Sequence, residues 1–153
     1  MRVSAKTDYA LRAEVELAAA APDGAPVKGE RLATSQSIPL RFLENILLQL
    51  RHAGIVESRR GADGGYKLAR APEEIALADV IRAIDGPLAG VSGQRPETLD
   101  FKGTSEPLRD VWIAVRASLR GVLEQVTLAD VAAGELPDNV RALTSEPDAW
   151  LPH

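Results

Sequence analysis

The most informative absence in this 153-residue chain is cysteine, of which there is none. Without a thiol there can be no disulfide, no thiolate metal site, no cysteine-held iron–sulfur cluster and no cysteine nucleophile. Long apolar stretches are also absent. The first residues carry no apolar signal core, and no run approaches the roughly 18 residues of a membrane span. We therefore expect a cytoplasmic protein with no membrane partner.

Residues suited to enzyme chemistry are scarce as well. The two histidines are His52, inside a predicted helix, and His153, the last residue. The sequence has no metal-ligand spacing and no glycine loop suited to phosphates, and its serines, histidines and aspartates are not arranged as a catalytic triad. We therefore expect neither an enzyme nor a bound cofactor or metal ion.

Positive charge is outnumbered overall but is unevenly spread. The formal net charge is −4, yet residues 1–70 hold 11 Lys and Arg against 8 Asp and Glu, whereas residues 71–153 hold 7 against 14. A local basic face, rather than the net charge, decides where phosphates bind. A chain of this length can form one compact core with an extension. The strongest pattern lies in its basic half.

That pattern runs from Ile38 to Leu68, where one helix is followed directly by a glycine-tipped hairpin. At about 100° per residue, one side of the helix is apolar and consists of Leu40, Leu43, Ile46, Leu47 and Leu50. The opposite side consists of Arg41, Asn45, Leu48, Gln49 and His52. The apolar side is expected to face the core. Pro39 suits the first helical turn, and Gly54 suits the C-terminal cap.

Residues 55–60 and 66–68 are expected to pair as two strands across Gly-Ala-Asp-Gly-Gly, whose glycines permit a tight turn. Arg59, Arg60 and Lys67 make this hairpin basic. A helix with a polar outer face joined to a basic hairpin can enter a DNA groove while the hairpin holds the adjacent backbone. A solvated helix beside an ordinary hairpin has the same pattern, so the residues alone leave both interpretations open.

Two helices are predicted before this stretch. Residues 4–21 are rich in good helix formers and begin at Ser4, a suitable cap. A break at residues 22–26 separates them from a second, short helix at residues 27–35. Helix, short helix, turn, helix and hairpin is the order of a winged helix-turn-helix.

The chain after the hairpin predicts one more helix, at residues 77–84, that Gly86 and the following proline end. Residues 86–106 have the composition of a long irregular loop. Thr127 to Asp130 has the spacing of a capping box that opens a short helix. The acidic, proline-containing tail that follows is expected to be frayed.

Between the loop and the capping box, apolar residues recur at spacings of three and four over about five turns. They are Leu108, Val111, Trp112, Val115, Leu119, Val122, Leu123 and Val126. Because this stripe follows the core elements, it would stay exposed without a partner, and we interpret it as a dimer helix. A helix folded back onto its own domain would hide the same stripe, and this alternative stays open.

Taken together, these segments resemble the Rrf2-type winged-helix transcription regulators, which include iron–sulfur cluster, nitric-oxide and cysteine-metabolism regulators. The resemblance covers residues 1 to about 133. It is carried by Met-Arg-Val-Ser, Tyr-Ala-Leu-Arg-Ala, Ile-Pro-Leu-Arg-Phe-Leu-Glu-Asn-Ile-Leu, Leu-Arg-His-Ala-Gly-Ile-Val, Ser-Arg-Arg-Gly-Ala-Asp-Gly-Gly-Tyr-Lys-Leu-Ala-Arg, Val-Ile-Arg-Ala-Ile-Asp-Gly-Pro-Leu and the stretch from Trp112 to Asp130. It implies a mostly α fold with a small β-hairpin. The implied parts are a winged helix-turn-helix at 1–86, a loop at 87–106, a dimerisation helix at 107–126, and a short helix and tail at 127–153.

The resemblance also implies a function, that of a homodimeric repressor on a palindromic operator in double-stranded DNA. The residues that it places on the DNA are Pro39, Arg41, Phe42, Glu44 and Asn45 in the recognition helix, Arg59, Arg60 and Lys67 in the wing, and Ser4 and Lys6 near the first helix. Arg41 can donate to guanine or phosphate, Asn45 can pair with adenine, and Phe42 can contact a thymine methyl. Arg60 suits a narrow minor groove. A winged-helix module that binds another protein is the alternative function.

Glu44 would repel phosphate, so it either accepts from a cytosine amino group or holds an arginine in place.

The sequence departs from the family at the loop of residues 91–106, where cluster-sensing relatives carry three cysteines and this chain carries none. Asp8 and Arg12 lie where some relatives recruit ligands from the first helix, but without a thiolate we interpret both as structural. We therefore predict no cluster. Either the effector is a different, unidentified molecule, or the protein binds DNA constitutively.

Overall fold

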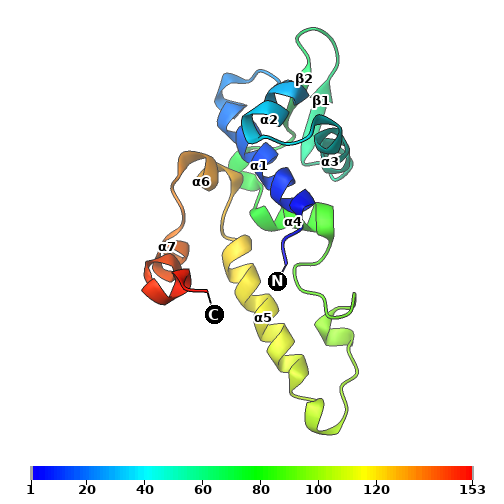
Figure 1. Ribbon diagram of the computed structural model, residues 1–153, viewed down its shortest axis with the longest axis vertical. Helices are drawn as coiled ribbons and strands as arrows, with labels where there is room; N and C mark the ends of the chain where they lie inside the picture. The colour runs from blue at the N-terminus through cyan, green and yellow to red at the C-terminus, as the bar shows by residue number, and fades with distance from the viewer. Residues whose placement is uncertain (1, 153) are drawn as a thin grey trace.

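The protein is built mainly from helices with one antiparallel pair of strands, and the computed structural model describes residues 2–152 (Figure 1). The elements are α1 (Ala5–Ala20), α2 (Gly29–Gln36), α3 (Leu40–His52), β1 (Val56–Arg59), β2 (Gly65–Leu68), α4 (Leu77–Asp85), α5 (Leu108–Leu123), α6 (Leu128–Ala133) and α7 (Asp138–Ser145). This order confirms the predicted mostly α fold with a small hairpin.

Helix α1 lies at the centre of the folded part and contacts α2, α3, α4, β2 and α6. Its first turn is capped as predicted, because the Ser4 hydroxyl accepts a hydrogen bond from the Thr7 backbone N–H at 3.1 Å. Alanines 10, 13 and 18 of this helix are buried. Their small side chains let the surrounding helices approach α1 closely.

The apolar side of α3 is buried, which confirms its prediction. The side chains without exposed surface are Leu43, Ile46, Leu47 and Leu50. Full burial of one such side chain contributes about 1.5–3 kcal/mol. Pro39 occupies the cap position just before the helix, one residue earlier than expected. Gly54 (φ 72°) ends the helix as predicted, since its N–H donates to the Arg51 carbonyl while the N–H of Ile55 reaches the Leu50 carbonyl, both at 3.0 Å.

The chain after α5 returns to the core, contrary to the expectation that the core is complete before this helix. Val126 is buried, and Leu128 has no exposed surface. The backbone N–H of Leu77 donates to the Val126 carbonyl, and that of Leu128 donates to the Ile75 carbonyl, both at 2.9 Å. These bonds join the start of α4 to the start of α6, and α6 packs against α1.

The predicted capping box at the start of α6 is present. The Thr127 hydroxyl accepts from the Asp130 N–H at 3.1 Å, and the Asp130 carboxylate accepts from the Thr127 N–H at 2.8 Å. The prediction of a frayed tail is wrong, because the tail contains α7 and a further 3₁₀ turn. The Asn139 side-chain amide donates to the Gly121 carbonyl at 3.0 Å, so α7 is attached to α5.

Helix α5 points away from the α1–α4 part, and the loop of residues 86–106 runs alongside it to its far end (Figure 1). The loop is irregular as expected, with two short 3₁₀ turns at Pro96–Thr98 and Gly103–Ser105. Arg116 of α5 donates to the Glu97 carboxylate at 2.5 Å, and Arg109 donates to the Leu99 carbonyl at 3.2 Å. These contacts hold the loop against one side of α5.

Candidate DNA-binding surface

The outer side of α3 carries every residue that sequence analysis placed on its DNA-contacting face. The exposed residues at the start of this helix are Pro39, Arg41, Phe42, Glu44 and Asn45. Their exposure follows from the helical period, because the leucines between them point inward. The helix is therefore held by its apolar side while its polar side stays open to a partner.

The exposed side chains of α3 differ in the contacts that they already make within the protein. Within the described part of the chain, Arg41 makes no ion pair, so its guanidinium is available to an anionic or acceptor group. The Asn45 amide donates to the Arg41 carbonyl one turn earlier at 3.2 Å, which leaves its oxygen and a second N–H for a partner. The Phe42 ring packs edge-on against Tyr9 of α1, with ring centroids 5.7 Å apart. This contact fixes the start of α3 against α1, and the sequence alone did not indicate it.

The hairpin projects from the end of α3 and presents its cations on one face. In the antiparallel register, Glu57 lies opposite Lys67, and Arg59 lies opposite Gly65. Successive side chains alternate between faces, so the buried Val56 and half-buried Leu68 take the inner face, and Arg59 and Lys67 take the outer face. Lys67 pairs with Glu57 at 2.9 Å. Arg60, at the beginning of the tip, is exposed and makes no ion pair within residues 2–152.

Two glycines are required for the shape of the hairpin tip. A Cβ atom at position 64 would lie 2.1 Å from the Arg59 carbonyl oxygen. At position 65, where φ is 150°, a Cβ atom would lie 2.5 Å from the Val27 carbonyl oxygen. No side chain fits at such distances. The tight turn that positions Arg60 therefore depends on Gly64 and Gly65.

Three contacts from other elements set the orientation of the hairpin. Arg51 of α3 donates to the Ser58 hydroxyl at 3.1 Å, and Lys28 donates to the Gly61 carbonyl at the tip at 3.2 Å. Residues 27 and 66 exchange two backbone hydrogen bonds, each 2.8 Å long. The hairpin thus keeps a defined position beside α2 and α3 (Figure 1). Sequence reasoning missed Lys28, since pairing between distant segments leaves no local signal.

Ser4 and Lys6 lie at the start of α1 rather than on α3 or the hairpin. The Ser4 hydroxyl donates to the Asp85 carboxylate of α4 at 2.9–3.0 Å while it caps α1. The Thr7 hydroxyl also donates to Asp85, at 2.6 Å. These hydroxyls, Thr7 most of all, hold the pKa of Asp85 below its usual value. Contact of Ser4 with phosphate stays a prediction, and the structure shows this hydroxyl engaged within the protein.

The predicted dimer face on α5 is only partly covered by its own chain. No residue of this helix is buried, and the exposed fractions of Val111, Leu108 and Val115 are 51, 43 and 40 %. The half-buried members of the stripe are Trp112, Leu119, Val122 and Leu123. A groove of about 730 Å³ follows the stripe, with Leu11, Ile81 and Leu143 along its sides. Of the original stripe, only Val126 is buried in the core.

The donor groups in the loop of residues 91–106 do not fit an iron site. It contains no thiol. Glu97 pairs with Arg116 and Asp100 with Lys102, so both carboxylates face cations. In the part of the chain that the structure describes, no three side chains of the metal-binding types gather. His153 lies outside the described residues.

Asp8 and Arg12 form an ion pair at 2.7 Å on α1, which is consistent with the structural role expected for them. Arg12 also stacks on the Tyr9 ring at 4.8 Å and donates to the Gln36 carbonyl at 3.2 Å. It therefore links α1 to the end of α2.

None of the helices described is long and apolar enough to span a bilayer.

A partly covered recognition helix followed directly by an attached basic hairpin defines a winged helix-turn-helix protein. The chain belongs to the Rrf2 family, whose description is "Iron-dependent Transcriptional regulator" and which it matches over residues 3–134. It is accordingly a helix-turn-helix transcriptional regulator rather than an enzyme. Because it contains no cysteine, it cannot hold an iron–sulfur cluster through thiolates.

Relatives support this assignment over most of the chain. The sequence is 52 % identical over 146 residues to Rv1287 of Mycobacterium tuberculosis, named as a candidate HTH-type transcriptional regulator, covering 95 % of this chain and 90 % of that protein. It is 35 % identical over 133 residues to the HTH-type regulator CymR of Bacillus subtilis, covering 87 and 91 % of the two chains.

Solved structures give the same result. The structure of CymR, titled the global cysteine regulator of B. subtilis, is similar with a TM-score of 0.75 and 32 % identity, covering 88 % of this chain and 98 % of that one. The structure of T. potens IscR is similar with a TM-score of 0.68 and 32 % identity, covering 100 and 93 % of the two chains.

Proposed function

We propose that this regulator is a cytoplasmic homodimeric repressor that binds a palindromic operator and senses through no iron–sulfur cluster. The observation that carries the proposal is the common exposure of Arg41 and Asn45 on α3 and of Arg59 and Arg60 on the hairpin. Cations and an amide that a fold leaves exposed on adjacent elements are suited to phosphates and base edges.

In this proposal, residues 1–86 form the DNA-binding part. The start of α3 enters the major groove, where Arg41 donates to guanine or phosphate and Asn45 pairs with an adenine edge. Arg60, at the hairpin tip and without an ion pair to any described residue, enters the minor groove, where a narrow groove concentrates negative potential. Arg59 and Lys67 contact phosphates from the outer face of the hairpin. Glu44, exposed on α3, discourages DNA sequences that offer it no amino group.

Residues 107–126 form the dimerisation part. Three large apolar side chains of α5 are at least 40 % exposed, and the groove beside them is open. A second copy of the same helix would cover both grooves at once by twofold symmetry. The two recognition helices would then contact half-sites about one DNA turn, or 34 Å, apart.

The proposal is tested by fluorescence anisotropy with the DNA segment upstream of the protein's own coding region, titrated at several salt concentrations. We expect log affinity to fall steeply with log salt, because cations on the protein displace counterions from phosphates. Arg41→Ala and Arg60→Ala should weaken binding. The control Lys102→Ala removes an exposed cation from the far loop and should not.

Two results would overturn the proposal. Binding without salt dependence, or equal loss with the Lys102→Ala control, would mean that α3 and the hairpin do not hold DNA. Retention of a protein partner by the same surface, with no affinity for DNA, would favour the winged-helix interaction module instead.

A further inference from the structure

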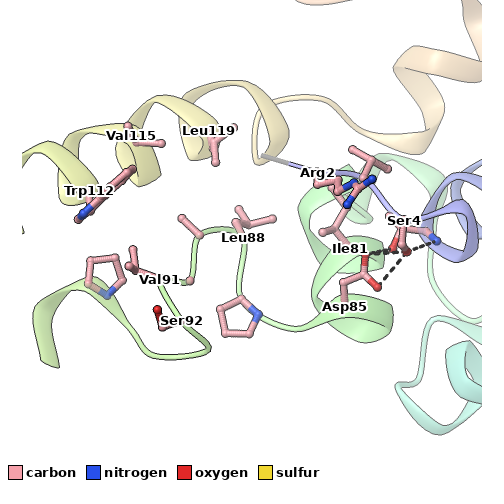
Figure 2. Close-up of a pocket in the computed structure, with 16 residues that line it drawn as sticks. Arg2, Ser4, Ile81, Asp85, Leu88, Val91, Ser92, Trp112, Val115 and Leu119 are labelled. Carbon is pink, nitrogen blue, oxygen red and sulfur yellow. Dashed lines mark hydrogen bonds between the residues drawn. The ribbon is translucent and has the colours of Figure 1, made fainter. Parts of the chain in front are cut away.

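A cavity of about 640 Å³ lies where the N-terminal segment, the end of α4, the loop after it and α5 meet (Figure 2). Its volume is in the range of pockets that take small molecules. Figure 2 shows that its two ends differ in character, with Arg2, Ser4 and Asp85 at one end and Trp112 at the other. The cavity is separate from the exposed polar side of α3.

The polar end carries one charge of each sign. Asp85 accepts hydrogen bonds from the Ser4 and Thr7 hydroxyls, and the Ser4 backbone and the charge of Lys6 also stabilise its carboxylate. Within residues 2–152, however, no cation lies at ion-pair distance from it. A carboxylate has about four acceptor positions, so Asp85 retains capacity for another donor. Arg2 is exposed and likewise makes no ion pair with any described residue. An anionic and a cationic group are thus available on one wall of a small cavity.

The remainder of the cavity is mainly apolar, with the Ser92 hydroxyl near the Trp112 end as an exception. Leu88 from the loop is buried, and Leu119 and Trp112 from α5 are half-buried. Figure 2 places Leu88, Leu119 and Val115 between the polar end and the Trp112 ring. This wall suits a hydrocarbon or aromatic group that extends several atoms away from the charged end.

We propose that the cavity binds a free α-amino acid with a bulky apolar side chain. Its ammonium group binds Asp85, its carboxylate binds Arg2, and its side chain lies between Leu88 and Leu119 toward Trp112. A zwitterion satisfies both charges at once, whereas a simple amine or a simple acid satisfies one and leaves the other unpaired.

This inference rests on the proposed function for its consequence, since the bound amino acid would act as the effector. Asp85 connects α4 to Ser4 and Thr7 at the start of α1. The same helix contacts Phe42 of α3 through Tyr9. A donor that competes for Asp85 therefore acts on α1, the helix that positions the recognition helix α3. Because α5 also lines the cavity, the bound amino acid acts on the predicted dimer face as well.

Binding can be followed through tryptophan fluorescence, because the chain has two tryptophans and only Trp112 lines the cavity. Trp150 is 74 % exposed on the final turn, and Trp150→Phe removes its signal. In this background we expect a saturable change with L-phenylalanine or L-leucine. Glycine, phenethylamine and 3-phenylpropionate should bind at least about tenfold more weakly, since each lacks the side chain or one charge.

Variants assign the two charges. Arg2→Ala and Asp85→Asn should each weaken amino-acid binding about tenfold or more. Lys102→Ala and Asp110→Asn are matched controls outside the cavity and should bind as the parent protein does. If Asp85→Asn fails to fold, as judged by circular dichroism, Arg2→Ala and the phenethylamine comparison still decide the assignment.

The proposal is overturned if no apolar amino acid gives a saturable signal at millimolar concentration, if phenethylamine binds as well as L-phenylalanine, or if Arg2→Ala binds normally. Operator affinity is measured separately, with and without L-phenylalanine or L-leucine. Amino-acid binding by a protein that does not bind DNA would refute the proposed function alone. DNA binding without amino-acid binding would refute this site alone.

Discussion

Because the Glu14 side chain is buried, we expect the free energy of unfolding to depend on pH in an unusual direction. Glu14 lies on α1 with no exposed surface, and neither carboxylate oxygen has a hydrogen-bond partner among the described residues. Burial without a partner disfavours the charged form and raises the pKa of Glu14 from 4.5 to about 8. The perturbation that tests this is Glu14→Met, which has a similar volume and no charge.

Proton binding to Glu14 determines whether stability rises or falls with pH. Between pH 4.5 and about 8, the folded protein holds a proton on Glu14 that the unfolded chain releases, so stability falls as pH rises through this range. At roughly 1.4 kcal/mol for each unit between the two pKa values, the group costs roughly 5 kcal/mol above pH 8 and roughly 3 kcal/mol at pH 7. Glu14→Met should therefore raise the free energy of unfolding by these amounts.

The assay is urea unfolding followed by circular dichroism, from about pH 5.5 to pH 8.5 at one fixed protomer concentration. Asp85, Glu97 and Glu124 have lowered pKa values, so their contributions are lost toward acid pH, opposite in direction to Glu14. These contributions are the same in Glu14→Met and in the parent protein, so they cancel when the two free energies of unfolding are subtracted.

Glu14→Gln should remove the pH dependence but keep part of the cost, because its amide is also buried without a partner. Glu106→Gln, at an exposed position, serves as the control and should change neither quantity. A stability difference between Glu14→Met and the parent that stays constant across this pH range would refute the reasoning.

Four further predictions concern the surfaces described above. Arg60→Ala should lower operator affinity by about 1–3 kcal/mol and leave the dimer intact; an unchanged titration would remove Arg60 from the groove. Val115→Asp should dissociate the dimer, since an unpaired buried charge costs several kcal/mol, and sedimentation that still shows a dimer would contradict the role of α5. Gly64→Ala should displace the hairpin tip, because the new Cβ would lie 2.1 Å from the Arg59 carbonyl oxygen, and we expect faster amide exchange in the hairpin together with weaker DNA binding. Ser4→Ala should lower the free energy of unfolding by about 1 kcal/mol or more, because it removes the α1 cap and the hydrogen bond to Asp85. A stability equal to the parent would show that the Thr7–Asp85 hydrogen bond is sufficient to hold this end of α1.

Local patterns in the sequence were sufficient for the recognition helix and much of the hairpin. The period of α3 assigned Leu43 and Ile46 to the core and Arg41 and Asn45 to the surface, and the structure agrees. A helical period depends only on neighbouring residues, so it can be read without knowledge of the fold. The cap at Ser4, the ending at Gly54 and the capping box at Thr127 are local in the same sense.

Contacts between distant segments could not be read in this way. The hydrogen bonds from Ser4 and Thr7 to Asp85 join positions about 80 residues apart, and nothing in either segment specifies the other. The same holds for the return of Leu128 to the core and for the attachment of α7 to α5, where sequence reasoning expected a finished core and a frayed tail.

By itself, then, the sequence determined the order of the elements from α1 to α6 and which side of α3 is buried, because both depend on spacing along the chain. The residues that contact DNA stay a prediction from the family resemblance. Only the tertiary structure decided that Glu14 lies in the core with no hydrogen-bond partner among residues 2–152, that Phe42 packs on Tyr9, and that Asp85 and Arg2 line one wall of a cavity. Burial and charge pairing depend on which segments meet in space, and that is settled only when the whole chain has packed.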